Sequence, residues 1–452
     1  MKQAIQILLL AAVLLALTSC GARRNEVPEP EGETSRPAVP PAAAQEEATL
    51  PDAAPEPTPE PLPLVLPDEA ERRLALMSPE EKAWQMMMLC SSEPDEVERA
   101  AGAGAGGICL YAQSFTGKSP EEVIAMTDAL QRSAPIPLLL AVDEEGGTVV
   151  RVSNNPQLRQ SPFASPHTLY EIGGWPLIES DAAVKSELLL SLGLNVNLAP
   201  VADTPLSWRN YIYPRCFSTD PEETADYVAR VVRVMKAAGI GSSLKHFPGY
   251  GGSADTHTGQ AFDERPIEAF TEGDFLPFAA GIGAGADSVL VSHNIVACMD
   301  GERPASLSPE VHRILREELG FEGVILCDDL EMDAIGMFTG GANAAVAAAL
   351  AGNDLICCRD TESSVRALTE AMESGLLPME QVDASVLRIL RWKLALGLNL
   401  GVCSQRKSFV IPPALQFQAD DAPSCGRHRA RNDNKPRFLP GRNRGLFFKT
   451  KH

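Results

Sequence analysis

Eight short apolar runs alternate with longer stretches of helical character between about Asp68 and Leu400. These runs are residues 86–89, 107–111, 138–142, 196–199, 240–244, 288–292, 324–327 and 354–357. Short apolar runs between helices are typical of parallel strands that are buried on both faces. Eight strand–helix units predict an α/β fold of the (β/α)8 TIM-barrel type, and a span of roughly 330 residues suits one barrel with insertions.

Four of the predicted helices begin with the same short pattern. Ser78, Ser119, Asp220 and Ser308 each precede a proline and one or two glutamates. Such a side chain caps the first turn, proline fits the first helical position, and acidic residues favour the positive helix end. After Asp220, apolar residues recur at helical spacing, and we expect that helix to stop near Gly239.

The first twenty residues have the features of an export signal. Lys2 precedes an apolar run over residues 5–17, which is too short for a comfortable membrane span. The run ends in Leu-Thr-Ser-Cys at Cys20, which resembles a bacterial lipobox. We therefore predict a lipoprotein signal peptide over residues 1–20 and lipidation of Cys20, with the protein anchored on the outer side of the cytoplasmic membrane, in the periplasm or at the cell surface. An ordinary cleaved signal with an incidental Cys20 is the alternative.

Two segments next to the predicted barrel (residues 67–400) lack its pattern. Residues 21–66 are rich in Pro, Glu and Ala, which predicts a disordered, extended linker. Residues 401–452 hold eleven Lys/Arg and three Asp/Glu, a net charge of +8, so the preceding residues must carry −29 for the chain to reach −21. We interpret this basic tail as disordered or as an artefact such as a shifted reading frame; binding to an anionic wall polymer is the alternative.

Composition also narrows the possible partners. The acidic balance before residue 401 argues against nucleic acid, because neutralising phosphates requires clustered Lys and Arg. Of the ten cysteines, several lie in or beside apolar runs, among them Cys109, Cys327, Cys357 and Cys358, and are interpreted as small buried hydrophobic residues. The sequence contains no Cys-x-x-Cys pair of the kind that binds zinc, and we expect no metal. We also expect no cofactor and a monomeric protein.

Polar residues gather where three of the predicted strands end. Run 240–244 passes directly into Lys245 and His246, followed by a Gly/Pro-rich loop that ends in Asp255-Thr256-His257. Run 138–142 leads into Asp143-Glu144-Glu145, and run 324–327 leads into Asp328-Asp329. The carboxyl ends of barrel strands share one edge, which is where barrel enzymes carry their active sites. The sequence therefore predicts one shared site.

These segments resemble glycoside hydrolase family 3, and most closely its single-barrel β-N-acetylhexosaminidases. The resemblance covers essentially all of residues 68–400 and rests on Lys245-His246-Phe247-Pro248-Gly249 with the following Asp-x-His, on Asp-Glu-Glu-Gly-Gly-Thr-Val-Val-Arg from Asp143 to Arg151, on Arg215-Cys-Phe, and on Asp328-Asp-Leu-Glu-Met. One departure is Tyr250, which stands where the family usually has a histidine.

The resemblance implies a role for each matching position. A retaining glycosidase needs a nucleophilic carboxylate and an acid/base. Asp328 matches the nucleophile, with Asp329 as a competitor that sequence alone does not separate. The resemblance implies that His257, paired with Asp255, is the acid/base, and a histidine, whose ordinary pKa is near 6.5, can exchange protons near neutrality. Glu145 is the alternative. The positions expected to bind the sugar are Asp143, Arg151, Arg215, Lys245 and His246.

The function implied is hydrolysis of terminal β-linked N-acetylglucosamine from peptidoglycan fragments or related chitin-like sugars. Three alternatives stay open. A non-catalytic, wall-anchored sugar-binding lipoprotein would share the anchor and the barrel. A β-N-acetylglucosaminide phosphorylase would use phosphate in place of water, and a β-glucosidase would differ in the sugar that it accepts.

Overall fold

The computed structural model describes residues 68–401. The predicted signal peptide 1–20 with Cys20, the linker 21–66 and nearly all of the tail 401–452 lie outside the described residues. Within residues 68–401, no helix combines the length and the apolar character that crossing a bilayer requires.

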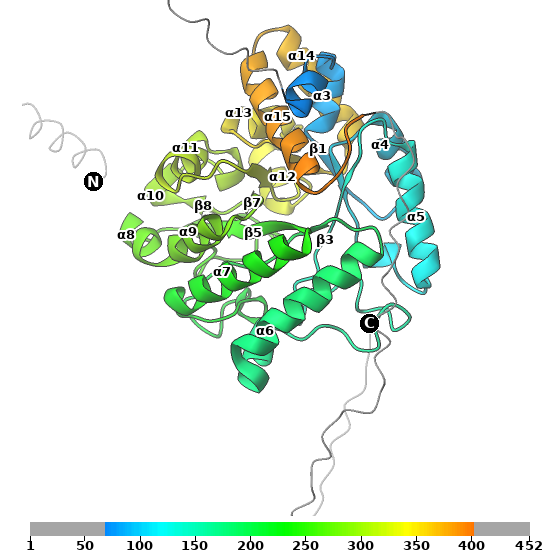
Figure 1. Ribbon diagram of the computed structural model, residues 1–452. Coiled ribbons are helices and arrows are strands. Elements are labelled where there is room, and N and C mark those ends of the chain that lie inside the picture. The colour runs from blue at the N-terminus through cyan, green and yellow to red at the C-terminus, as the bar shows by residue number, and fades with distance from the viewer. Residues whose placement is uncertain (1–67, 402–452) are drawn as a thin grey trace, which may run out of the picture. The chain divides into compact units, whose positions relative to one another are not determined.

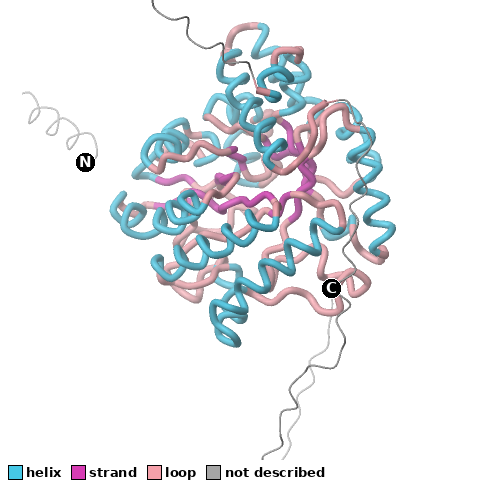
Figure 2. Tube along the Cα trace, viewed as in Figure 1, coloured by secondary structure: helices cyan, strands magenta, loops and turns pink. Residues whose placement is uncertain are grey.

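Eight parallel strands form one sheet in the order β10-β1-β2-β3-β4-β5-β7-β9. A parallel bridge between Leu326 and Leu355 links the two outer members, so the sheet curls into a nearly closed barrel that the helices surround (Figure 2). The strands are β1 (Met87–Cys90), β2 (Gly107–Cys109), β3 (Leu139–Val142), β4 (Val196–Asn197), β5 (Gly241–Phe247), β7 (Ser288–Val291), β9 (Val324–Cys327) and β10 (Ile356–Cys358). Each overlaps one of the eight predicted runs, and the predicted (β/α)8 barrel is confirmed.

Two short strands, β6 (Phe262–Asp263) and β8 (Ile295–Val296), pair with each other in the loops that follow β5 and β7. Helices surround the sheet, and most of them are labelled in Figure 1. They are α2 (Glu69–Leu74), α3 (Pro79–Gln85), α4 (Pro94–Ala103), α5 (Pro120–Ser133), α6 (Pro166–Ser191), α7 (Pro221–Ala238), α8 (Ile267–Ala269), α9 (Phe275–Ala284), α10 (Ala297–Asp300), α11 (Pro309–Arg313), α12 (Asp333–Thr339), α13 (Ala345–Ala351), α14 (Thr361–Glu373) and α15 (Met379–Ala395).

The predicted helix starts are confirmed. Ser78 and Ser119 form complete capping boxes, in which the hydroxyl accepts from the third helical amide and the glutamate there bonds back to the cap. Asp220 and Ser308 accept from amides in the first turns of α7 and α11. Helix α7 ends at Ala238, and Gly239 follows with φ 80°, a left-handed conformation that glycine adopts at little cost.

The barrel core contains the methionine run and most cysteines of the described chain. Met86, Met87 and Met88 are fully buried, so they belong to the core. Cys109, Cys327, Cys357 and Cys358 are buried free thiols, as predicted. They pack at strand positions, so they contribute to the core as small apolar side chains.

A buried lysine stands out in this apolar packing. Lys393 in α15 is completely buried, and its Nζ donates to the Gln85 side-chain oxygen at 2.7 Å. Burial lowers the pKa of Lys393 well below its ordinary value of 10.5. The unfolded chain therefore binds a proton at this side chain over a pH range in which the folded chain does not.

We expect this lysine to make stability depend on pH. Between its folded and unfolded pKa values, the unfolded state holds the extra proton, so the free energy of unfolding should rise by up to about 1.4 kcal/mol per pH unit. Denaturant unfolding of the wild type and of Lys393→Met at several pH values below 10 measures the difference between the two curves. Parallel curves would show that Lys393 keeps an ordinary pKa.

Candidate active site

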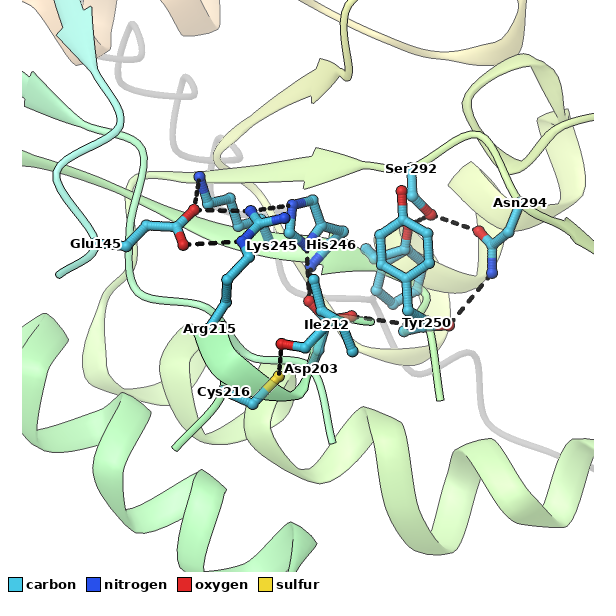
Figure 3. Close-up of polar contacts among 12 residues, drawn as sticks. Glu145, Asp203, Ile212, Arg215, Cys216, Lys245, His246, Tyr250, Ser292 and Asn294 are labelled. Carbon is cyan, nitrogen blue, oxygen red and sulfur yellow. Dashed lines mark hydrogen bonds and ion pairs between the residues drawn. The ribbon is translucent and has the colours of Figure 1, made fainter. Parts of the chain in front are cut away.

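A buried cluster of charges lies at the carboxyl ends of β3 and β5 (Figure 3). The Lys245 ammonium lies 2.6 Å from Asp143 Oδ1 and 2.6 Å from Glu145 Oε1. Burial by itself would lower the pKa of Lys245, but the charges of Asp143 and Glu145 outweigh it and raise that pKa. The lysine is therefore a fixed positive charge at the base of the site.

Arg215 holds the same glutamate from the other side. Its guanidinium donates from Nε to Glu145 Oε2 at 3.0 Å and from Nη2 to Oε1 at 2.8 Å. Burial would raise the pKa of Glu145, but Arg215 and Lys245 outweigh it and bring that pKa well below its usual range. A carboxylate held anionic by two cations is a poor proton donor near neutrality, which disfavours Glu145 as the acid/base.

Removing this charge should destabilise the fold. Glu145→Gln leaves Arg215 and Lys245 with less compensation in a buried setting, and we expect a loss of about 3–5 kcal/mol in the free energy of unfolding. Denaturant unfolding near pH 7 measures it, with Glu187→Gln on the exposed face of α6 as the matched control. Equal stability of both variants would contradict a structural role for the cluster.

His246 is engaged by protein partners through both ring nitrogens. Arg215 Nη2 lies 3.0 Å from Nε2, and because arginine only donates, Nε2 accepts and Nδ1 donates to Asp203 Oδ2 at 2.6 Å. Asp203 also accepts from the backbone amides of His246 and Tyr250. The structure thus gives His246 an internal role in orienting Arg215, and its contact with a sugar hydroxyl stays a prediction.

The two adjacent aspartates after β9 differ in their surroundings. Asp328 is half-buried; burial would raise its pKa, but the neighbouring His293 and His246 and the Asp329 amide, which donates to Asp328 Oδ1 at 2.9 Å, outweigh it and lower that pKa. Asp329 has a pKa raised to about 6, first by burial and then by the charge of Asp328. Its two oxygens accept from the Glu331 amide at 3.1 Å and the Tyr111 hydroxyl at 3.4 Å.

Two residues at this edge of the barrel, Asp203 and His293, were not predicted from the sequence. Asp203 is a single acidic residue in the apolar stretch after β4, and it is part of no recognisable motif. His293 follows directly after the predicted strand 288–292, which was the available signal. Its Nε2 donates to the backbone carbonyl of Asp329 at 2.9 Å and its Nδ1 lies 2.7 Å from Ser306 Oγ. His293 therefore fixes the backbone beside Asp328, and burial lowers its pKa.

The structure brings Asp255 and His257 together in the loop between β5 and β6, residues 248–261, which we call the dyad loop. Asp255 Oδ1 lies 2.7 Å from His257 Nδ1 and accepts from the His257 amide at 3.0 Å. The two side chains are 34% and 60% exposed. His257 is the last of the groups that lower the pKa of Asp328.

The start of the dyad loop requires glycine. Gly249 and Gly251 have φ of 119° and 51°, and a methyl group on either would lie 2.3 Å from Asp274 Oδ1 or Arg265 Nη2. Tyr250 between them is buried, and its hydroxyl lies 2.6 Å from Thr256 Oγ1. The tyrosine that departs from the family pattern thus ties the start of the loop to the centre of the dyad.

The five positions predicted to bind the sugar are joined to one another and to Glu145 by hydrogen bonds and ion pairs. Arg151 Nη2 lies 3.7 Å from Asp143 Oδ2, which joins it to the cluster around Lys245 and Arg215. Glu144 is instead structural, since it is fully buried and accepts from the backbone amides of residues 151–153. Fixed charges and hydrogen-bonding groups at one barrel edge, next to an anionic carboxylate, suit a substrate rich in hydroxyl groups.

Comparison with known proteins agrees with this geometry. Residues 78–392 match the model of the glycosyl hydrolase family 3 N terminal domain. The beta-hexosaminidase of Xanthomonas campestris pv. campestris (strain B100) is 34% identical over 273 residues, which cover 59% of this chain and 80% of that protein. The beta-hexosaminidase of Xanthomonas oryzae pv. oryzae (strain MAFF 311018) is 33% identical over 334 residues, which cover 73% of this chain and 96% of that protein.

A solved structure is similar as well. A glycoside hydrolase family 3 beta-N-acetylglucosaminidase from Paenibacillus sp. str. FPU-7 aligns with a TM-score of 0.67 and 30% identity. The alignment covers 74% of this chain and 65% of that one, a little under two thirds of its length. The predicted resemblance to the family's β-N-acetylhexosaminidases is confirmed by these relatives. The chain therefore belongs to glycosyl hydrolase family 3 and is a glycosidase that hydrolyses O-glycosyl compounds.

Proposed function

We propose that this enzyme is a retaining glycosidase that removes terminal β-linked N-acetylhexosamine, with Asp328 as nucleophile and His257 with Asp255 as acid/base. The main support for this proposal is the difference between the surroundings of Asp328 and Asp329, the two aspartates at the end of β9. Asp328 is half-buried and has a lowered pKa, so it is anionic at neutral pH. Asp329 has a raised pKa and both oxygens engaged by protein donors.

In this two-step mechanism each of the three groups has a defined task. An Asp328 oxygen attacks the anomeric carbon while the bond from that carbon to the leaving oxygen breaks. The leaving oxygen takes the proton from His257 Nε2, because Nδ1 is directed at Asp255. In the second step His257 takes a proton from water, which attacks the anomeric carbon and releases Asp328. The carboxylate of Asp255 stabilises the imidazolium that donates the proton in the first step and forms again in the second, and between the two steps the ring is neutral.

We further propose peptidoglycan fragments as the natural pool of substrate. The support is the predicted export, which would place the enzyme beside the cell wall, together with the beta-hexosaminidase and beta-N-acetylglucosaminidase names of the relatives. The buried ions around Lys245 support recognition of a sugar, because each buried hydroxyl of a ligand needs a hydrogen-bond partner.

One assay of the full-length chain tests this function. We expect release of 4-nitrophenol from its β-N-acetylglucosaminide, much faster than from its β-glucoside, with free N-acetylglucosamine as product whether or not phosphate is present. A sugar 1-phosphate formed only with phosphate would identify a phosphorylase. Binding of N-acetylglucosamine without turnover of either glycoside would identify a sugar-binding protein.

We also propose that the enzyme is exported and lipid-anchored at Cys20. The support is the lipobox-like sequence that ends there. Membrane fractionation of cells that express the wild type or Cys20→Ala tests it: the wild type should sediment with membranes, and the variant should appear in the periplasm or medium. A cytoplasmic wild type with residues 1–19 intact would refute the anchor.

A further inference from the structure

The loop between β4 and α7 carries two large apolar side chains that the fold leaves uncovered. Leu206 is 62% exposed and Trp208 is 68% exposed. Both ends of the loop are anchored in the site, since Asp203 bonds to His246 and Arg215 bonds to Glu145. The exposed side chains therefore lie on the segment between two site residues, at the carboxyl edge of the barrel.

This segment contacts the dyad loop directly. The Leu206 amide donates to the carbonyl of Gly251 at 3.3 Å. A methyl group placed on Gly252 would lie 3.0 Å from Leu206 Cδ1. Because Asp255 is three residues further along, the Leu206 side chain packs against the part of the dyad loop that leads to the acid/base pair.

A second apolar group flanks the far end of the dyad loop. Met337 in α12 is 63% exposed, and a methyl group on Gly259 would lie 3.8 Å from its sulfur. The amide of Ala334, at the start of the same helix, donates to the carbonyl of Thr256 at 3.4 Å. The dyad loop thus lies between Leu206 and Met337, two uncovered apolar side chains on different elements.

Single exposed apolar residues are common and need no explanation, but an exposed indole beside a sugar-processing site is different. A sugar ring presents C–H groups on its faces, and a flat aromatic ring offers a large rigid surface for them. The Arg209 guanidinium lies over the Trp208 ring at 4.9 Å, a cation–π contact that orients the indole while leaving it exposed.

We propose that Trp208, with Leu206 beside it, is a stacking platform for the leaving-group sugar of the substrate. The inference rests on the proposed function, in which His257 exchanges a proton with the leaving oxygen. Whatever is bonded to that oxygen then lies beside the dyad loop, where Leu206 forms one flank and the exposed Trp208 follows two residues along the same segment. The platform favours substrates whose leaving group is itself a sugar ring over substrates with a small leaving group.

The test compares two substrates that share the N-acetylglucosaminyl group. The β-linked disaccharide of N-acetylglucosamine has a leaving-group ring, whereas N-acetyl-β-glucosaminyl fluoride has none. In Trp208→Ala we expect the ratio of kcat/KM for the disaccharide to that for the fluoride to fall about 3- to 10-fold. Trp208→Phe keeps an aromatic ring and should recover most of that ratio. Leu376→Ala, an equally exposed apolar position between α14 and α15, should keep the wild-type ratio.

The possible failures are distinguishable. A wild type that turns over both substrates, with the ratio unchanged in Trp208→Ala, overturns the platform and leaves the proposed function standing. Equal losses on both substrates make Trp208 a structural residue and also overturn it. A wild type that turns over neither substrate overturns the proposed function and the platform with it.

Discussion

Asp328→Asn is expected to remove nearly all turnover, by on the order of 10⁴- to 10⁶-fold in kcat, because an amide cannot form the glycosyl-enzyme bond. Asp328 is the carboxylate at the end of β9 whose pKa is lowered, so it is anionic near neutral pH. Initial rates on the aryl β-N-acetylglucosaminide measure the loss, and thermal unfolding of the variant checks that the fold persists.

Asp329→Asn is the matched control, since the two residues are neighbours in the chain. With a pKa of about 6, Asp329 is already partly protonated near neutrality, and an asparagine imitates that form. We expect it to lose far less activity than Asp328→Asn. A 5-fluoro glycosyl trap followed by peptide mapping should label Asp328; a label on a peptide without Asp328 would show that the nucleophile lies elsewhere.

The barrel was predictable because its signals are local. Each buried strand appears in the sequence as a short apolar run, and each of the four helix starts noted above combines a capping residue with a proline, so the pattern survives without knowledge of the packing. The position of Lys245, Asp143 and Asp328 at one edge of the barrel was also predictable, because the carboxyl ends of parallel strands lie together. The difference between the pKa values of Asp328 and Asp329 could not be predicted from the sequence, since it depends on burial and on His293 and His246, which come from other strands.

What the sequence did not predict depends on contacts between distant segments. Asp203 gains its role only because the chain after β4 passes beside the backbone of His246 and Tyr250. Glu145 remained an alternative acid/base on sequence alone because it is an acid near the other site residues. Its bonds to Arg215, 70 positions away, together with Lys245 make it a permanent anion.

The acid/base assignment makes a prediction that depends on the leaving group. In His257→Ala, hydrolysis of the natural disaccharide should fall by about 10²–10⁴-fold, the usual contribution of general acid–base catalysis. An aryl glycoside should lose much less in its first step, because nitrophenolate leaves without a proton. Deglycosylation, which still needs a base, should then limit its turnover. Steady-state rates on both substrates measure the difference.

Added azide separates a proton-transfer role from a binding role. Azide attacks the glycosyl-enzyme without a general base, so it should restore part of the aryl-glycoside rate of His257→Ala and yield the glycosyl azide. Asp255→Ala should show the same selectivity more mildly, because the imidazole remains and loses only the carboxylate 2.7 Å away that orients it. Equal losses on both substrates without azide rescue would make His257 a binding or structural residue. The proton donor would then have to be a group other than Glu145, since Lys245 and Arg215 keep that carboxylate anionic near neutral pH.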